Sequence, residues 1–86
     1  MKKAIWKFPF AASIDMPVGA LILTAQVQRG QIMLWALVNT GDFGVESRKF
    51  VIFGTGHPVT EWNPKYIATI QLEGGDFIGH IFERMQ

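Results

Sequence analysis

Hydrophobic and polar residues alternate with a period of two in several short stretches of the chain, which is the pattern of half-buried β-strands. In residues 3–10 the aromatic side chains fall on one face and the lysines on the other. Residues 20–28 repeat the alternation, and its predicted apolar face carries Leu21, Leu23, Ala25 and Val27. Further apolar runs occupy residues 31–38, 48–54, 66–72 and 77–84. This pattern predicts an all-β fold of about six strands, either a small antiparallel sandwich or an open barrel.

Turn-forming residues separate these predicted strands. Arg29-Gly30 lies between the second and third strands, and glycine tolerates the positive φ that a two-residue hairpin turn requires. Gly74-Gly75 predicts a second turn of this primed type between the last two strands. Pro17 and Gly19 are expected to break regular structure after the first strand. Residues 39–47 are polar and rich in glycine, and they are expected to form a loop.

The stretch 31–38 is apolar on both of its predicted faces. One face carries Ile32, Leu34, Ala36 and Val38, and the other carries Met33, Trp35 and Leu37. In a domain of this size one face of a strand packs on the core, whereas the other needs cover from another element or another subunit. This strand therefore predicts a homo-oligomer, either a dimer or a tetramer.

The composition narrows the class of protein. The chain has 86 residues, which predicts a single domain, residues 1–86, too small to enclose a large cleft within one subunit. A net charge of +1 provides no basic field for binding long nucleic acid. Cysteine is absent, which excludes disulfides and thiolate chemistry. Lys7 and Pro9 interrupt the N-terminal apolar residues well before the length of a membrane span, so we expect no membrane association and a cytoplasmic location.

The stretch "FGTGHPVTEW", residues 53–62, gathers groups that suit a ligand site. Two glycines allow the backbone to approach a ligand, Thr55 offers a hydroxyl, His57 offers a donor or an acceptor, and Trp62 offers a stacking surface. The stretch lacks the lysine and serine spacing of a P-loop, and a pair of glycines after a strand also occurs in an ordinary turn. From these residues alone, both interpretations remain open.

Other residues are weaker candidates for binding or catalysis. Arg48 and Lys49 are adjacent on a predicted strand and point to opposite sides, so one of them is able to reach a phosphate. The guanidinium of Arg48 is better suited to bidentate binding of a phosphate, although two solvated charges are the simpler interpretation. Trp35 lies among apolar neighbours, as a core residue would. His80 alternates with apolar residues and is expected to be a hydrogen-bonded structural histidine. No nucleophile motif or metal-ligand spacing is present, so we expect no catalysis, no metal and no cofactor.

Six segments, in this order, resemble a family of small phage and prophage proteins, most of them uncharacterised: "AIWKF", "MPVGA", "LWALVN", "GTGHP", "YIATIQL" and "GHIFE". Some members of what looks like the same family are viral sponge proteins of the anti-CBASS type. They bind the cyclic nucleotide signals of bacterial anti-phage defence without cleaving them. The chain departs from this family at Phe8 and in the loop "NTGDFGVES", where its relatives look more proline-rich and acidic, so the resemblance does not identify a ligand.

The residues and the resemblance together predict a non-catalytic protein that sequesters a cyclic nucleotide in the host cytoplasm, with pockets at subunit interfaces. The expected ligand-binding residues include the loop residues Thr55, Gly56, His57 and Trp62, with Arg48. Lys7 and Trp35 complete this set. Two alternatives remain: a phage accessory module that binds a host protein, and a small phosphodiesterase that uses His57 as its general base.

Overall fold

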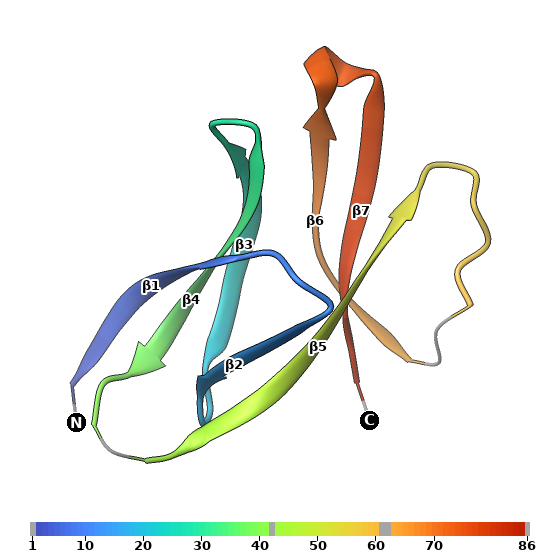
Figure 1. Ribbon diagram of the computed structural model, residues 1–86. Helices are drawn as coiled ribbons and strands as arrows, with labels where there is room; N and C mark the ends of the chain where they lie inside the picture. Colours follow the sequence, from blue (N-terminus) through green and yellow to red (C-terminus); the bar gives the residue numbers. More distant parts are fainter. Residues whose placement is uncertain (1, 42, 61–62, 86) are drawn as a thin grey trace.

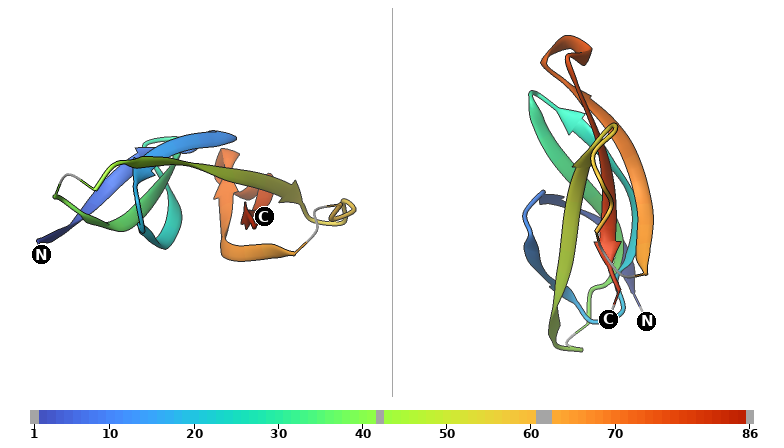
Figure 2. Two further views of the ribbon diagram at one scale, coloured as in Figure 1. Left: turned by 90° about the horizontal axis from the view of Figure 1, so that it is seen from below. Right: turned by 90° about the vertical axis from the view of Figure 1, so that its right-hand side faces the viewer.

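Two antiparallel sheets pack face to face in the computed structural model, which describes residues 2–41, 43–60 and 63–85 (Figure 1). The described residues form seven strands: β1 (Lys3–Pro9), β2 (Ser13–Pro17), β3 (Leu21–Gln28), β4 (Gln31–Asn39), β5 (Val45–Gly54), β6 (Pro64–Leu72) and β7 (Phe77–Arg84). The first sheet has the order β1-β4-β3 and the second has the order β2-β5-β7-β6. The predicted all-β antiparallel sandwich is confirmed. Its Cα atoms span 41 × 31 × 15 Å, so the molecule is a thin slab (Figure 2).

Strand β2 is the element that the sequence pattern did not predict. It pairs with β5, which begins at Val45 and takes up part of the predicted loop 39–47. Ile14 and Met16 are buried, whereas Ser13 and Asp15 are exposed, so the strand does alternate. The alternation was not recognised in the sequence because the strand has only five residues and ends in a proline. Because β2 is an edge strand, Pro17 at its end is compatible with the sheet.

A β-bulge in β3 reverses part of the predicted pattern. The register with β4 shifts between Ile22 and Thr24, so that the residues on either side of the shift follow different alternations. Ile22 packs against the core, whereas Leu21 and Leu23 are exposed. The predicted apolar face was therefore wrong for these leucines, because one extra residue in a strand moves the side chains before it to the opposite face.

The two predicted hairpin turns have different outcomes. Arg29 and Gly30 have φ values of 51° and 79°, as a primed two-residue turn requires, and this prediction is confirmed. Between β6 and β7, Leu72 pairs with Phe77, so the connection has four residues and contains the 3₁₀ turn η1 (Glu73–Gly75). The prediction of a two-residue turn was wrong there, because the positive φ begins at Glu73, one residue before the glycine pair.

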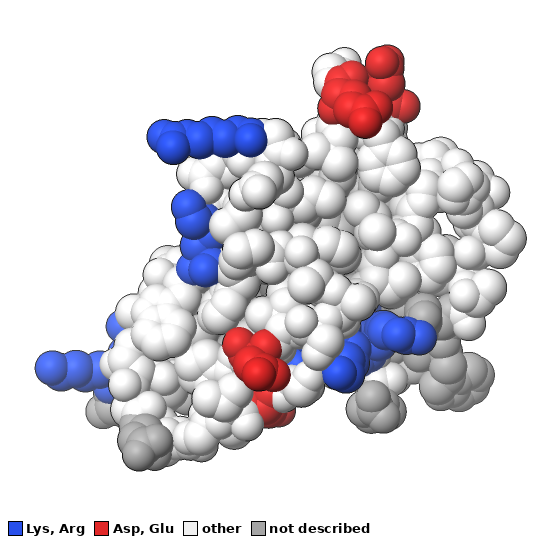
Figure 3. Space-filling view, in the orientation of Figure 1, with Lys and Arg blue, Asp and Glu red and all other residues white. Residues whose placement is uncertain are grey.

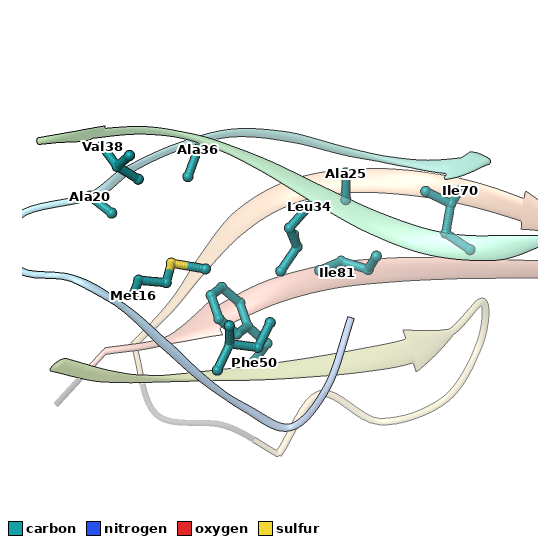
Figure 4. Close-up of a cluster of buried hydrophobic side chains, with 10 residues drawn as sticks. Met16, Ala20, Ala25, Leu34, Ala36, Val38, Phe50, Ile70 and Ile81 are labelled. Carbon is teal, nitrogen blue, oxygen red and sulfur yellow. The ribbon is translucent and has the colours of Figure 1, made fainter. Parts of the chain in front are cut away.

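The core lies between the two sheets, where side chains from both point toward one another (Figure 4). The first sheet contributes Leu34, Ala36 and Val38 from one side of β4, and the second contributes Met16, Phe50, Ile70 and Ile81. The sequence pattern separated the two faces of β4, and the structure shows that the even-numbered residues face the core.

The outer side of β4 receives part of its cover from within the chain. Lys7 on β1 donates a hydrogen bond to Gln28 on β3, with an Nζ–Oε1 distance of 2.7 Å. Since β4 lies between these strands, the Lys7 side chain passes over it, and Met33 beneath is buried. Ile5 nevertheless remains 61% exposed on this side. The doubly apolar strand therefore needs less cover from a second subunit than its sequence indicates.

Candidate functional site

The outer side of the four-stranded sheet carries a cluster of three aromatic residues. Phe53 on β5 lies opposite His80, and Tyr66 on β6 lies opposite Phe82, while the residues that alternate with them point into the core. The Phe82 ring meets the Phe53 and Tyr66 rings edge to face, with centroid distances of 5.9 and 5.5 Å. These packed rings form a fixed apolar floor for a pocket.

The turn that follows β5 forms one wall of this pocket. The His57 amide donates to the Gly54 carbonyl oxygen at 3.1 Å, and Gly56 has a φ of 85°, as the third residue of a type II turn requires. A Cβ atom on Gly54 would lie 2.9 Å from Nδ1 of His57, so glycine at this position lets the imidazole fold back over the end of the strand. Both glycines therefore have a structural role in shaping the turn.

A chain of hydrogen bonds joins the turn to strands β6 and β7. Thr55 Oγ1 lies 2.8 Å from Nε2 of His80, and Thr69 Oγ1 lies 2.9 Å from Nδ1 of the same ring. Tyr66 Oη extends the chain to Thr69 Oγ1 at 2.8 Å. His80 is hydrogen-bonded, as the sequence predicted, and its ring is held in one orientation beside the aromatic cluster.

These groups line an open pocket of about 210 Å³. Its walls are Phe53, Gly54, Thr55, Gly56, His57, Val59, Tyr66, His80 and Phe82. No lysine, arginine, aspartate or glutamate occurs among these described lining residues, and the surface around the end of β5 is correspondingly uncharged (Figure 3). A pocket of this size is smaller than the usual site for a whole drug-sized ligand. It suits one flat, uncharged ring that accepts or donates a few hydrogen bonds.

The structure brings together part of the binding site predicted from the sequence. Thr55, Gly56 and His57 line the pocket. Lys7 and Trp35 are register partners on the other sheet, so they are near each other but belong to a different surface. Trp62 lies outside the described residues.

Arg48 is engaged on the inner side of its sheet. Its Nε and Nη2 atoms donate to the two carboxylate oxygens of Glu83, and its Nη1 atom donates to the Ala20 carbonyl oxygen at 2.8 Å. Glu83 is only 4% exposed, and its hydrogen bond raises the pKa of Arg48. Arg48 precedes Phe53 by five residues, which is roughly 17 Å along a strand. The structure therefore gives Arg48 a structural partner and does not bring it to the pocket.

The aromatic floor and Thr69, which is hydrogen-bonded to His80, were missed by sequence reasoning. The alternation of residues 77–84 placed His80 and Phe82 on the same face of a strand, and both lie on the same face of β7 in the structure. Their neighbours Phe53, Tyr66 and Thr69 come from other strands, so only the strand register identifies them as partners. No signal in the local sequence of those strands fixes this register.

Two kinds of feature are absent from the described part of the chain. No three residues among histidine, cysteine, aspartate and glutamate gather as a metal site would require. Nor does any helix within residues 2–41, 43–60 and 63–85 have the length and apolar character needed to cross a membrane.

The fold and the pocket define a small β-sandwich protein with an aromatic pocket on the outer side of one sheet. The chain belongs to the family DUF7352, described as a domain of unknown function, and the family model matches residues 1–86. No curated protein and no solved structure matches the chain. A function must therefore be argued from the site itself.

Proposed function

We propose that the protein is a non-catalytic binding protein that sequesters a cyclic nucleotide, with one base held in the aromatic pocket. The observation that carries this proposal is the aromatic floor of Phe53, Tyr66 and Phe82 beside the hydrogen-bonded His80. Stacking of a base on an aromatic side chain contributes about 1 to 3 kcal/mol, and the hydroxyl groups at the rim supply hydrogen bonds to the base edge or the ribose. The biological setting, a viral sponge for a defence signal in the host cytoplasm, rests on the resemblance in the sequence.

The arrangement around the two histidines supports binding over hydrolysis. Thr55 and Thr69 occupy both ring nitrogens of His80, which leaves neither nitrogen available to take a proton from water. His57 would need a partner to orient it as a general base, and none of the described residues that line the pocket is a carboxylate. The positioned groups that a phosphodiesterase requires are therefore not assembled in the described pocket.

Melting experiments test the proposal directly. We expect one member of a panel of cyclic dinucleotides, cyclic trinucleotides and cyclised ADP-ribose isomers to raise the melting temperature and to be recovered intact, because binding to the native state stabilises it. Phe82→Leu should weaken that binding by about tenfold, since it removes a stacking surface worth roughly 1 to 3 kcal/mol. Phe43→Leu is the matched control, because Phe43 is an exposed phenylalanine outside the pocket.

The other outcomes of this experiment are also informative. No shift with any compound would overturn the proposed function and favour the protein-interaction alternative. Conversion of a compound to product would instead identify an enzyme, and His57→Ala would then be expected to abolish turnover while sparing the fold.

We also propose that the chain forms a homodimer or a homotetramer. On the outer side of the three-stranded sheet, Ile5 and Leu21 both lie opposite Leu37, so the three aliphatic side chains form one row across the sheet. Ile5 and Leu21 are exposed, and a second copy of the chain would remove this row from water.

Sedimentation of the wild-type protein should therefore give the mass of a dimer or a tetramer. Ile5→Lys should shift it to the monomer without loss of β structure, because a charge placed in the row opposes its burial. Val45→Lys is the control, since Val45 is exposed on the other sheet. A monomeric wild-type protein at micromolar concentration would contradict this assignment and leave the row available to a different protein.

A further inference from the structure

A second polar cluster lies on the exposed surface where β2 pairs with β5. Lys49 Nζ donates to Ser13 Oγ at 2.9 Å and to Ser47 Oγ at 3.1 Å, and the two serine oxygens lie 2.8 Å apart. Lys49 and Ser13 are register partners, which brings the three side chains together from two strands. A surface lysine is usually held only by water, so this ammonium group is unusually well fixed.

The count of hydrogens shows which ligand the cluster suits. The ammonium group has three donors, of which the serines accept two, and one of the two hydroxyl protons is used in the bond between the serines. One N–H and one O–H donor therefore remain to be satisfied. Two adjacent donors, one of them cationic, match the oxygens of an anion such as phosphate.

Charges of both signs surround the cluster. Lys49 makes no ion pair with any described residue, although Asp15 lies opposite Ser47 in the neighbouring register position. A hollow of about 310 Å³ near the end of β7 is lined by Ser47 and Lys49 together with Glu46, Arg48, Glu83, Arg84 and Met85. Figure 3 shows acidic groups over β2 and β5 and basic groups near the lower end of β7. The cluster therefore lies beside an open space bordered by charges of both signs, of which Arg48 is paired with Glu46 and Glu83.

We infer that Ser13, Ser47 and Lys49 form a binding site for a phosphate group. The site also supplies a positively charged group, which the described lining of the aromatic pocket lacks. Lys49, Val51 and Phe53 follow one side of β5, and Val51 lies opposite Phe82. Lys49 is two residues from Val51, roughly 7 Å along the strand, and four residues from the pocket residue Phe53, roughly 13 Å. A nucleotide whose base stacks near Phe82 is thus able to place its phosphate at the serine-lysine cluster; this extension rests on the proposed function.

Inorganic phosphate is the probe for the site itself. In an amide NMR titration at low ionic strength, phosphate should shift the signals of Ser13, Ser47 and Lys49 with a saturable curve. Lys49→Met should weaken this binding by about fivefold or more, since even an exposed charge pair contributes measurably when salt is low. Lys3→Met is the matched control, because Lys3 lies on the other sheet. Asp15→Asn should tighten phosphate binding, because it removes the neighbouring negative charge.

Two results would overturn the site. One is the absence of shifts at these three amides, and the other is an equal loss of phosphate binding in Lys3→Met and Lys49→Met, which would indicate a general charge effect. Neither result depends on what the aromatic pocket binds, because phosphate carries no ring.

The link between the two sites is tested with the four common ribonucleosides and their 5′-monophosphates. We expect Lys49→Met to weaken binding of a monophosphate by about fivefold and to leave the matching nucleoside unchanged. Equal affinity of the variant and the wild type for the monophosphate would overturn the link. If no nucleoside perturbs Phe53, Tyr66 or Phe82, the proposed function and the link both fail, and the phosphate titration still decides the serine-lysine site.

Discussion

Replacement of Glu83 by alanine should lower the free energy of unfolding by about 3 to 5 kcal/mol, which is the usual effect of removing one partner from a buried ion pair. Arg48 would keep its charge on the inner side of the sheet and would lose the carboxylate that accepts two of its hydrogen bonds. Its remaining ion-pair partner among the described residues would be the more distant Glu46 carboxylate, 3.7 Å from its Nη1 atom. A small domain is stable by about 5 to 15 kcal/mol, so the variant should lie close to the unfolding threshold. Urea denaturation followed by circular dichroism measures this change.

A double variant separates the charge effect from a packing effect. Arg48→Met combined with Glu83→Leu replaces both partners by apolar side chains, and this kind of replacement is often neutral or stabilising. We therefore expect the double variant to be more stable than Glu83→Ala alone. The Arg48 side chain is 17% exposed, so water reaches part of the pair. A loss below about 1 kcal/mol in Glu83→Ala would mean that water screens the pair as it screens surface pairs.

The two adjacent cations in the middle of β5, Arg48 and Lys49, show how far sequence reasoning reaches. Alternation correctly predicted that Arg48 and Lys49 point to opposite sides. It did not identify which of them faces inward, because that depends on β2, which was missed, and on Glu83, a partner 35 positions away. The preference for Arg48 as the phosphate ligand rested on guanidinium chemistry alone. In the structure the half-buried Lys49, on the outer side of β5, carries the open donors. Its serine partners are again identified only by the β2–β5 register.

The fold was predictable where the local pattern was regular and long. Strand β4 follows from a continuous apolar run that begins after a turn, and the turn at Arg29-Gly30 follows from backbone sterics. Both signals act over a few residues. Strand β2 and the bulge in β3 were not predictable in this way, because a five-residue edge strand gives little periodicity and a bulge leaves the composition unchanged. The pocket shows the same limit: the turn at residues 54–57 was recognisable, whereas its aromatic floor depends on pairing between distant strands.

Two phenylalanines on β5 allow stability and binding to be separated. Phe50 is 2% exposed in the core, whereas Phe53 lies on the outer side and forms part of the pocket floor. Phe50→Ala should lower the free energy of unfolding by about 3 to 5 kcal/mol, through lost burial and the cavity that remains. Phe53→Ala should lower it by about 1 to 2 kcal/mol, since its ring is half-buried and loses one aromatic contact.

The effects of the two variants on ligand affinity should have the opposite order, with the larger loss in Phe53→Ala. Phe53→Ala removes a stacking surface worth about 1 to 3 kcal/mol per base, so affinity for a nucleotide should fall by roughly tenfold while the protein stays folded. Phe50→Ala leaves the pocket side chains in place, and its folded fraction should bind as the wild type does. If Phe50→Ala does not fold, Phe50→Leu provides a milder loss of core packing for the same comparison. Equal effects of the two alanine variants on stability would contradict the assignment of these residues to opposite sides of β5. Unchanged nucleotide affinity in Phe53→Ala would contradict the proposal that the base stacks on the aromatic floor, because stacking is the only role proposed for the Phe53 ring.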